Sequence, residues 1–225
     1  MKIFRDRREA GRELAKRLAA HRGAGDVVVL GLPRGGLPVA AEVAEFLGAP
    51  LGAQLVRKLG VPGEPELAMG AIASGGVIVR NEDVLRMLRI SEDELRRVAQ
   101  REQLEMERRE RAYLGNRSRP QIAGRTVIVV DDGMATGSTM HAAVLALRQS
   151  GASRIIVAVP TASHQACALL CDDVDECICL SQPEPYFAVG QSYLSFSQTS
   201  DAEVTALLDA AAKREADGAP PAGPP

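Results

Sequence analysis

The chain has 225 residues, of which 46% are hydrophobic and 25% charged, and its formal net charge at pH 7 is -2. This composition excludes an intrinsically disordered chain, and the absence of net positive charge argues against a general nucleic-acid binder. No apolar run approaches the roughly 18 residues that span a bilayer, and the N-terminus lacks the apolar stretch of a secretory signal. We therefore expect a soluble cytoplasmic protein that binds neither nucleic acid nor membrane.

The basic N-terminal segment is predicted to form an amphipathic helix. Ala10, Leu14 and Leu18 are four residues apart and would share one helix face. The other positions carry Arg5, Arg7, Arg8, Arg12, Lys16 and Arg17. A basic arm can attract phosphate groups, but we interpret these residues as an ordinary solvated helix surface.

Short apolar runs alternate with helical segments through the next part of the chain. The predicted strands are 27–32, 51–57, 126–131, 154–159 and 176–180, and the predicted helices are 37–47, 141–148 and 163–170. This alternation is typical of an α/β domain with a mainly parallel central sheet flanked by helices. Ligands of such domains bind at the carboxyl ends of the strands.

A long insert, residues 58–125, separates the second predicted strand from the third. It contains two short strands joined at Ser74-Gly75-Gly76, and a capping box of Ser91 and Glu94 starts a charged helix. One narrow apolar stripe runs along this helix and consists of Leu95, Val98, Ala99, Met106 and Tyr113. We expect the stripe to lie on the core or against a partner subunit, and the charges to be solvated.

The four cysteines are Cys167, Cys171, Cys177 and Cys179. Their spacing matches no recognised zinc site. Free cysteines are among the most buried residue types, so we expect thiols that pack as small hydrophobic side chains. A redox or metal site built on these cysteines, with His164 nearby, is the alternative interpretation.

The segment most informative about function is TVIVVDDGMATGSTM, residues 126–140. A predicted strand ends in Asp131 and Asp132, and a turn of small residues then opens a helix. Such a turn lets backbone N–H groups converge on a phosphate, and the helix dipole adds positive potential. The turn lacks the lysine of a P-loop and the G-x-G-x-x-G of dinucleotide folds. Two carboxylates beside a phosphate site fit a sugar phosphate; the alternative is that they only cap the turn and the helix.

A second turn of the same kind follows the first predicted strand and contains Arg34, Gly35 and Gly36. A glycine-rich turn alone is weak evidence for a binding site. Two such turns at one edge of the sheet, however, would provide two anion sites. Arg57 and Lys58 end the next predicted strand and would add two cations at the same edge of the sheet; the alternative is an ordinary exposed strand end.

The run VIVVDDGMATGST resembles the phosphoribosyl-pyrophosphate (PRPP) motif of the type I phosphoribosyltransferases. The resemblance covers about residues 25–200, and FRDRREAG, VRKLGVPGEPELAMGA and FAVGQSYLSF resemble one of its prokaryotic branches. It implies that Asp131 and Asp132 hold the ribose hydroxyls. It implies that the 5′-phosphate is held by Ala135, Thr136, Gly137, Ser138 and Thr139. Pyrophosphate would be bound by Arg34, Gly35, Gly36 and Arg57, with Lys58 and the acid pair as catalytic residues, and Mg²⁺ would arrive with PRPP rather than on protein ligands.

The resemblance also predicts a type I phosphoribosyltransferase fold with a small hood over the acceptor. A single domain would span residues 1–213, with its core at 25–180, the insert at 58–125 and the hood mainly at 181–200, and a disordered tail would follow at 214–225. The hood region holds Tyr186, Phe187, Tyr193 and Phe196. The first three are candidates for an acceptor pocket because aromatic rings stack on flat bases; hydrophobic packing is the alternative.

The predicted function is transfer of the ribose 5-phosphate group of PRPP to a nitrogenous base or related acceptor, with release of pyrophosphate. The family suggests a homodimer. Hypoxanthine and guanine enzymes have an acidic residue where this chain has Ala135, so that specificity is not expected. The alternative function is a non-catalytic protein that senses PRPP or a nucleotide.

Overall fold

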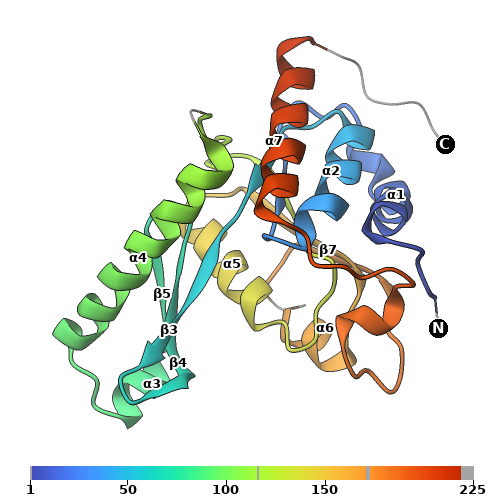
Figure 1. Cartoon of the computed structure of the whole chain (residues 1–225). Coiled ribbons are helices and arrows are strands. Elements are labelled where there is room, and N and C mark those ends of the chain that lie inside the picture. Colours follow the sequence, from blue (N-terminus) through green and yellow to red (C-terminus); the bar gives the residue numbers. More distant parts are fainter. Residues whose placement is uncertain (1, 116, 171–172, 219–225) are drawn as a thin grey trace.

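The computed structural model describes residues 2–115, 117–170 and 173–218 (Figure 1). The helices are α1 Arg7–Arg17, α2 Gly36–Leu47, α3 Glu82–Met87, α4 Glu92–Leu114, α5 Ser138–Gln149, α6 His164–Leu170 and α7 Asp201–Ala216. The strands are β1 Val27–Gly31, β2 Leu51–Ala53, β3 Val56–Val61, β4 Glu64–Ala73, β5 Val77–Arg80, β6 Thr126–Val130, β7 Arg154–Thr161 and β8 Glu176–Ser181. Single 3-10 turns span Ala19–His21 and Val189–Ser192.

The main sheet is parallel throughout, with the strand order β2-β1-β6-β7-β8. Two of its three inner strands, β1 and β6, are buried along their whole length. Strands with helices on both faces need apolar side chains in both directions, which explains the continuous Val, Ile and Leu runs. The α/β class with a mainly parallel sheet, which the sequence predicts, is confirmed.

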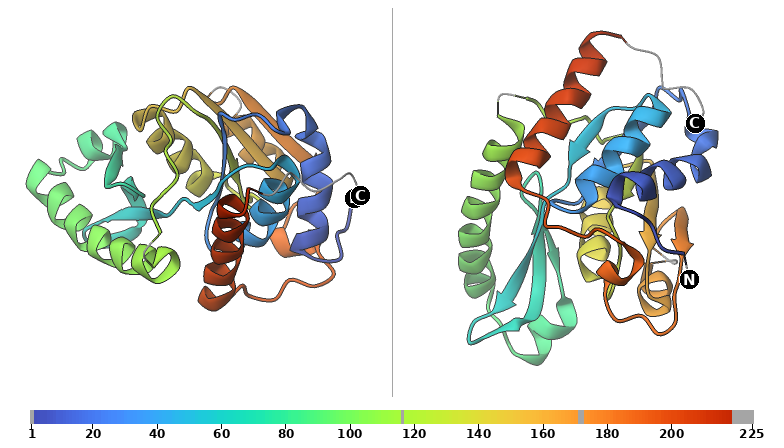
Figure 2. Two further views of the ribbon diagram at one scale, coloured as in Figure 1. Left: turned by 90° about the horizontal axis from the view of Figure 1, so that it is seen from above. Right: turned by 45° about the vertical axis from the view of Figure 1, so that its right-hand side comes forward.

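Helices cover both faces of the main sheet, as the views in Figure 2 show. Alternate residues of β1 point to opposite sides: Val27 and Val29 pack with α1, α2 and α7, whereas Val28 and Leu30 pack with α5 and α6. Among the residues that the structure describes, no helix combines the length and the apolar character that crossing a membrane requires.

The predicted strand 51–57 is wrong, because the chain changes sheets within it. β2 ends at Ala53 in the main sheet, and Gln54 still donates its backbone N–H to Gly31 at 3.0 Å. Leu55 then exchanges hydrogen bonds with Ser74, and β3 begins at Val56 in a second, antiparallel sheet of order β3-β4-β5. A run of apolar residues does not reveal which sheet its backbone joins, so the pattern alone could not locate this change.

The insert is formed by the second sheet together with α3 and α4. The turn predicted at residues 74–76 joins β4 to β5, and Gly75 and Gly76 have φ angles of 90° and 76° there. The predicted capping box is also present: the Ser91 hydroxyl accepts from the Glu94 N–H, and the Glu94 carboxylate accepts from the Ser91 N–H. The predicted apolar stripe of α4 is buried and joins the core cluster that contains residues of β3, β4 and α7. Figure 1 shows α4 lying along this sheet, to one side of the main sheet.

The C-terminal helix α7 was not predicted, and the tail expected at 214–225 is wrong at its start. Ser200 caps α7, and Val204, Leu208 and Ala211 bury one face of it, so that the helix continues to Ala216. This amphipathic spacing lies shortly before the proline-rich end of the sequence, which is what led to the prediction of a disordered tail. Positions 219–225 of the expected tail lie outside the described residues.

Residues 181–200, the segment predicted as the hood, contact the first residues of the chain. The backbone N–H of Phe4 donates to Ser192 at 2.8 Å, and that of Leu194 donates to Phe4 at 2.8 Å. Phe4 is buried in a small cluster with Ala10 and Tyr193. These contacts place the start of α1 beside the hood and near the carboxyl end of β6.

Candidate active site

The acid pair lies directly after β6, at the carboxyl edge of the main sheet. Asp132 is buried, and its backbone N–H donates to the Asp131 carboxylate at 2.8 Å. Burial raises the pKa of both carboxyl groups, and the neighbouring Asp132 carboxylate raises that of Asp131 further. Arg7 acts in the opposite direction on the pKa of Asp132. Two adjacent carboxyls with raised pKa values, one half-buried and one buried, are typical of a functional site.

Arg7 is a site residue that the sequence analysis missed. Its Nε donates to Asp132 Oδ2 at 2.7 Å, and both side chains are only 12% exposed. Its Nη1 donates to the Ser197 carbonyl at 2.7 Å, and the guanidinium lies 4.0 Å from the centre of the Phe196 ring. The interpretation of the basic helix as a solvated surface holds for Arg5 and Arg8 but is wrong for Arg7. Its position in the first turn of α1, which docks on the hood, is a tertiary feature without a local sequence signal.

Tyr193 supports the acid pair from the hood. Its hydroxyl donates to the Asp132 carbonyl at 2.6 Å. Its ring is buried between Phe196 and Phe4, with centroids at 5.1 Å and 5.8 Å. Tyr193 therefore offers little open ring surface to an acceptor, and hydrophobic packing accounts for its position.

The other two aromatic candidates differ in their surroundings. Phe187 is 83% exposed. Tyr186 is partly buried, and burial raises its pKa to about 12. The three predicted acceptor residues thus do not form one common stacking surface, and Tyr186 and Phe187 remain candidates.

The turn after the acid pair is firmly anchored and opens at the N-terminus of α5. The Met134 N–H donates to Thr161 at 3.0 Å, and the Ser163 hydroxyl donates to the Ala135 carbonyl at 2.6 Å. Gly137 has a φ angle of 76°, which favours glycine, and it packs against α6. The side chains of Ala135, Thr136, Ser138 and Thr139 are exposed. An anion at this turn would face the first turn of a twelve-residue helix, where the Ser138 N–H donates to the Thr136 hydroxyl at 3.4 Å.

The glycine-rich turn after β1 touches the acid pair. A Cβ atom at Gly35 would overlap the Asp132 carboxylate, and one at Gly36 would lie 2.7 Å from the Val130 carbonyl. The two predicted anion sites are therefore adjacent, and the acid pair lies where they meet. Arg34 is 38% exposed, and its Nη1 lies 3.7 Å from the Asp201 carboxylate at the start of α7.

Replacing Gly35 with alanine is expected to destabilise the protein by about 1–3 kcal/mol, because the added methyl group has to displace Asp132. Urea unfolding measures this loss, and the same variant should bind ribose 5-phosphate more weakly. Gly25→Ala is the matched control, since a Cβ atom there meets nothing within 4 Å. Equal stability of the two variants would contradict the close approach of the turn to the acid pair.

Arg57 and Lys58 do not lie together at the edge of the main sheet, because both belong to β3. Neighbouring strand residues point to opposite faces. Arg57 lines a cavity of about 410 Å³, and Arg34 lines the same cavity. Lys58 lines a different cavity of about 670 Å³, together with Ser138 and Thr139 of the other turn. The structure thus brings Arg57 to the glycine-rich turn and Lys58 to the turn that follows the acid pair.

The cysteines lie where α6 packs on β8. Gln182 donates to the Cys167 sulfur at 2.9 Å, and the Cys179 thiol donates to the Ser181 carbonyl at 3.2 Å. Cys177 and Cys179 pack against the core cluster beneath α5 and α6, and Cys171 lies outside the described residues. Residues 2–115, 117–170 and 173–218 contain no group of side chains suited to hold a metal ion.

Comparisons with known proteins agree with this geometry. A family model described as "Phosphoribosyl transferase domain" matches residues 4–195. A protein of Mycobacterium tuberculosis (strain H37Rv) named "Putative phosphoribosyl transferase Rv0571c" is 48% identical over 211 residues. This match covers 94% of this chain and 47% of that protein, so the chain spans about half the length of its curated relatives. The crystal structure of TT1426 from Thermus thermophilus is 44% identical, with a TM-score of 0.83, and the match covers 92% of this chain and 98% of that one. The chain belongs to the phosphoribosyl transferase domain family.

Proposed function

We propose that this chain transfers the ribose 5-phosphate group of PRPP to a nitrogenous acceptor and releases pyrophosphate. The observation that carries the proposal is the contact between the two turns, in which Gly35 leaves no room for a side chain beside Asp132. A ligand anchored in both turns has to place its middle over Asp131 and Asp132. A sugar with phosphate groups at both ends has this shape.

Each part of such a substrate has a suitable partner. The 5′-phosphate would accept hydrogen bonds from the backbone N–H groups of residues 135–139 and the hydroxyls of Ser138 and Thr139. The ribose 2′- and 3′-hydroxyls would donate to Asp131 and Asp132. A carboxylate has about four acceptor positions, so Asp132 can accept from ribose while it keeps its ion pair with Arg7.

Catalysis would depend on how charge is placed around the ribose ring. As the bond between ribose C1 and pyrophosphate breaks, positive charge develops on the ring, as in glycoside hydrolysis. The acid pair stabilises this positive charge, whereas Arg34 and the N–H groups of the glycine-rich turn stabilise the departing pyrophosphate. A nitrogen atom of the acceptor then forms the new bond to C1.

Mg²⁺ would be held by the substrate more than by the protein. Asp132 is already paired with Arg7, and Asp131 already accepts a backbone hydrogen bond, which leaves a donor set poorer than that of a dedicated magnesium site. Bound to the pyrophosphate, the ion would neutralise part of its negative charge.

Lys58 is assigned to a different part of the substrate from the one the sequence suggested. Because it shares a cavity with Ser138 and Thr139, we assign its charge to the 5′-phosphate end rather than to pyrophosphate. Phe187 and Tyr186, at the edge of the hood, are the side chains proposed to meet the acceptor. The acceptor would react through a nitrogen atom, which acts as the nucleophile.

Calorimetric titration with PRPP and Mg²⁺, followed by a screen of nucleobases for pyrophosphate release, tests the proposal. The expected result is saturable PRPP binding and acceptor-dependent release of pyrophosphate. Binding without release for every nucleobase would contradict transfer to a base and would favour the sensing function. Absence of PRPP binding would contradict both functions.

A further inference from the structure

A basic cavity lies between the insert and the glycine-rich turn. It has a volume of about 410 Å³, and four arginines line it: Arg34, Arg57, Arg108 and Arg109. They come from the turn after β1, from β3 and from α4, which are far apart in the sequence. The carboxylate that lines the same cavity is Asp201 at the start of α7.

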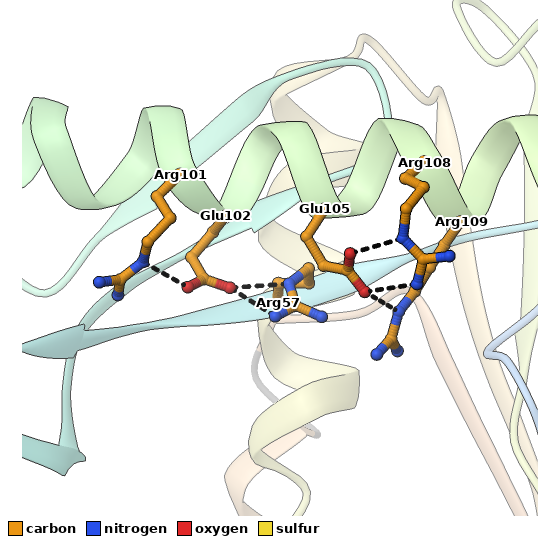
Figure 3. Close-up of polar contacts among 6 residues, drawn as sticks. All are labelled: Arg57, Arg101, Glu102, Glu105, Arg108 and Arg109. Carbon is orange, nitrogen blue, oxygen red and sulfur yellow. Dashed lines mark hydrogen bonds and ion pairs between the residues drawn. The ribbon is translucent and has the colours of Figure 1, made fainter.

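The arginines of the insert are held in place by carboxylates of α4, as Figure 3 shows. Arg57 donates to Glu102 from Nε and Nη2, at 2.8 Å and 2.5 Å. Glu105 accepts from Arg108 at 2.8 Å and 2.9 Å and from Arg109 at 2.9 Å. These contacts fix the orientation of the guanidinium groups, and less conformational freedom is then lost when a ligand binds.

The charges of α4 therefore have a second interpretation besides solvation. Pairs of Glu105 with Arg108 and Arg109 at spacings of three and four residues are common on solvated helices and contribute little to stability. An ordinary solvated helix face, however, would not be expected to line a cavity together with Arg34 and Arg57, which belong to two other elements. Asp201, Glu102 and Glu105 offset three of the four positive charges, so one positive charge is left over to attract an anion into the cavity.

We propose that Arg108 and Arg109 bind the pyrophosphate end of PRPP, opposite Arg34 and Arg57. This inference rests on the proposed function, and it adds a wall from α4 to the site. The arginine fork matches phosphate oxygens in pairs, and a pyrophosphate group offers oxygens to several forks at once. Arg34 connects the cavity to the acid pair, because the next residue, Gly35, touches Asp132.

Titration of the whole protein with inorganic pyrophosphate and, separately, with ribose 5-phosphate tests the assignment. The variant is Arg108→Gln/Arg109→Gln, and the matched control is Arg101→Gln. Arg101 lies on the same helix and pairs with Glu102, but it does not line the cavity. Arg108 and Arg109 are 66% and 48% exposed, so their removal should leave folding intact.

The double variant should bind pyrophosphate at least about tenfold more weakly, since two charge-assisted contacts are lost, and should bind ribose 5-phosphate as the wild type does. The control should change pyrophosphate affinity by less than about twofold. Unchanged pyrophosphate affinity in the double variant, or an equal loss in the control, would overturn the proposal. Loss of ribose 5-phosphate binding as well would overturn a role confined to the pyrophosphate end.

The same titrations separate this inference from the proposed function. Pyrophosphate binding that depends on Arg108 and Arg109, in a protein that shows no turnover of PRPP, supports the anion site and contradicts the transferase. If the protein turns over PRPP but its pyrophosphate affinity does not depend on Arg108 and Arg109, the transferase is supported and the anion site is overturned.

Discussion

Replacing Arg7 with glutamine is expected to destabilise the protein by about 3–5 kcal/mol, the usual cost of removing one partner from a buried ion pair. Arg7 and Asp132 are each 12% exposed, so the variant would leave a carboxylate in a site with little water. The side chain also bonds the Ser197 carbonyl and lies over Phe196, which ties α1 to the hood. Urea unfolding at pH 7.5 measures the loss.

Arg8→Gln is the matched control for this variant. Arg8 also belongs to α1 and pairs with Glu42 at 3.3 Å, but it is 54% exposed, so its loss should cost no more than about 1 kcal/mol. A loss for Arg7→Gln as small as that of the control would show that the Arg7 pair is not a structural part of the site.

The cost of Arg7→Gln should depend on pH. Burial raises the pKa of Asp132 and Arg7 lowers it, so without Arg7 this pKa rises further. A carboxyl with a raised pKa in the folded state costs stability as the pH rises through that value. The variant should therefore be closest to the wild type at acidic pH, below the range in which Asp132 loses its proton, and furthest from it at neutral pH. A difference in unfolding free energy that is constant from pH 4 to pH 7.5 would contradict the role assigned to Asp132.

Replacing Asp131 and Asp132 together with asparagine is expected to lower kcat/KM for PRPP by about 100-fold or more. Hydrogen bonds to a charged group contribute about 1.5–3 kcal/mol each, and the charge that opposes the developing cation is lost as well. Steady-state assays of pyrophosphate release measure this effect. Binding of inorganic pyrophosphate should change little, because its proposed ligands are the arginines and the glycine-rich turn.

Two further variants separate the loss of chemistry from the loss of structure. Asp131→Asn keeps an oxygen that can accept from the Asp132 N–H, and it leaves the Arg7 pair intact, so it should fold normally and still lose most activity. Asp26→Asn removes a carboxylate at the opposite end of β6, where it accepts from the Thr126 hydroxyl, and should retain activity. Full activity in Asp131→Asn would contradict the role of that residue in ribose binding.

Much of the fold could be predicted because it follows from local patterns. The buried runs of β1 and β6, the turn at 74–76 and the Ser91 capping box each have a signal within a few residues. The change of sheet at Gln54 and Leu55 has no such signal, since it depends on Ser74, nineteen residues further along the chain. The helix α7 had a readable signal, Val204, Leu208 and Ala211 after the cap at Ser200, which the prolines near the C-terminus obscured.

Some residues of the candidate site have a local sequence signal, and others do not. Its turns could be found because glycine and small residues have to follow a strand wherever a backbone binds a phosphate. Arg7 could not be found, since its importance depends on the docking of α1 against the hood. Lys58 and Arg57 were predicted as one pair, but the alternation of β3 places them in two cavities.

A crystal structure of the complex with PRPP and Mg²⁺ tests the central claim most directly. We predict the 5′-phosphate on the backbone N–H groups of residues 135–139, the ribose hydroxyls on Asp131 and Asp132, and the pyrophosphate against Arg34. A ligand bound elsewhere, or bound at these two turns with its ribose turned away from both carboxylates, would contradict the account.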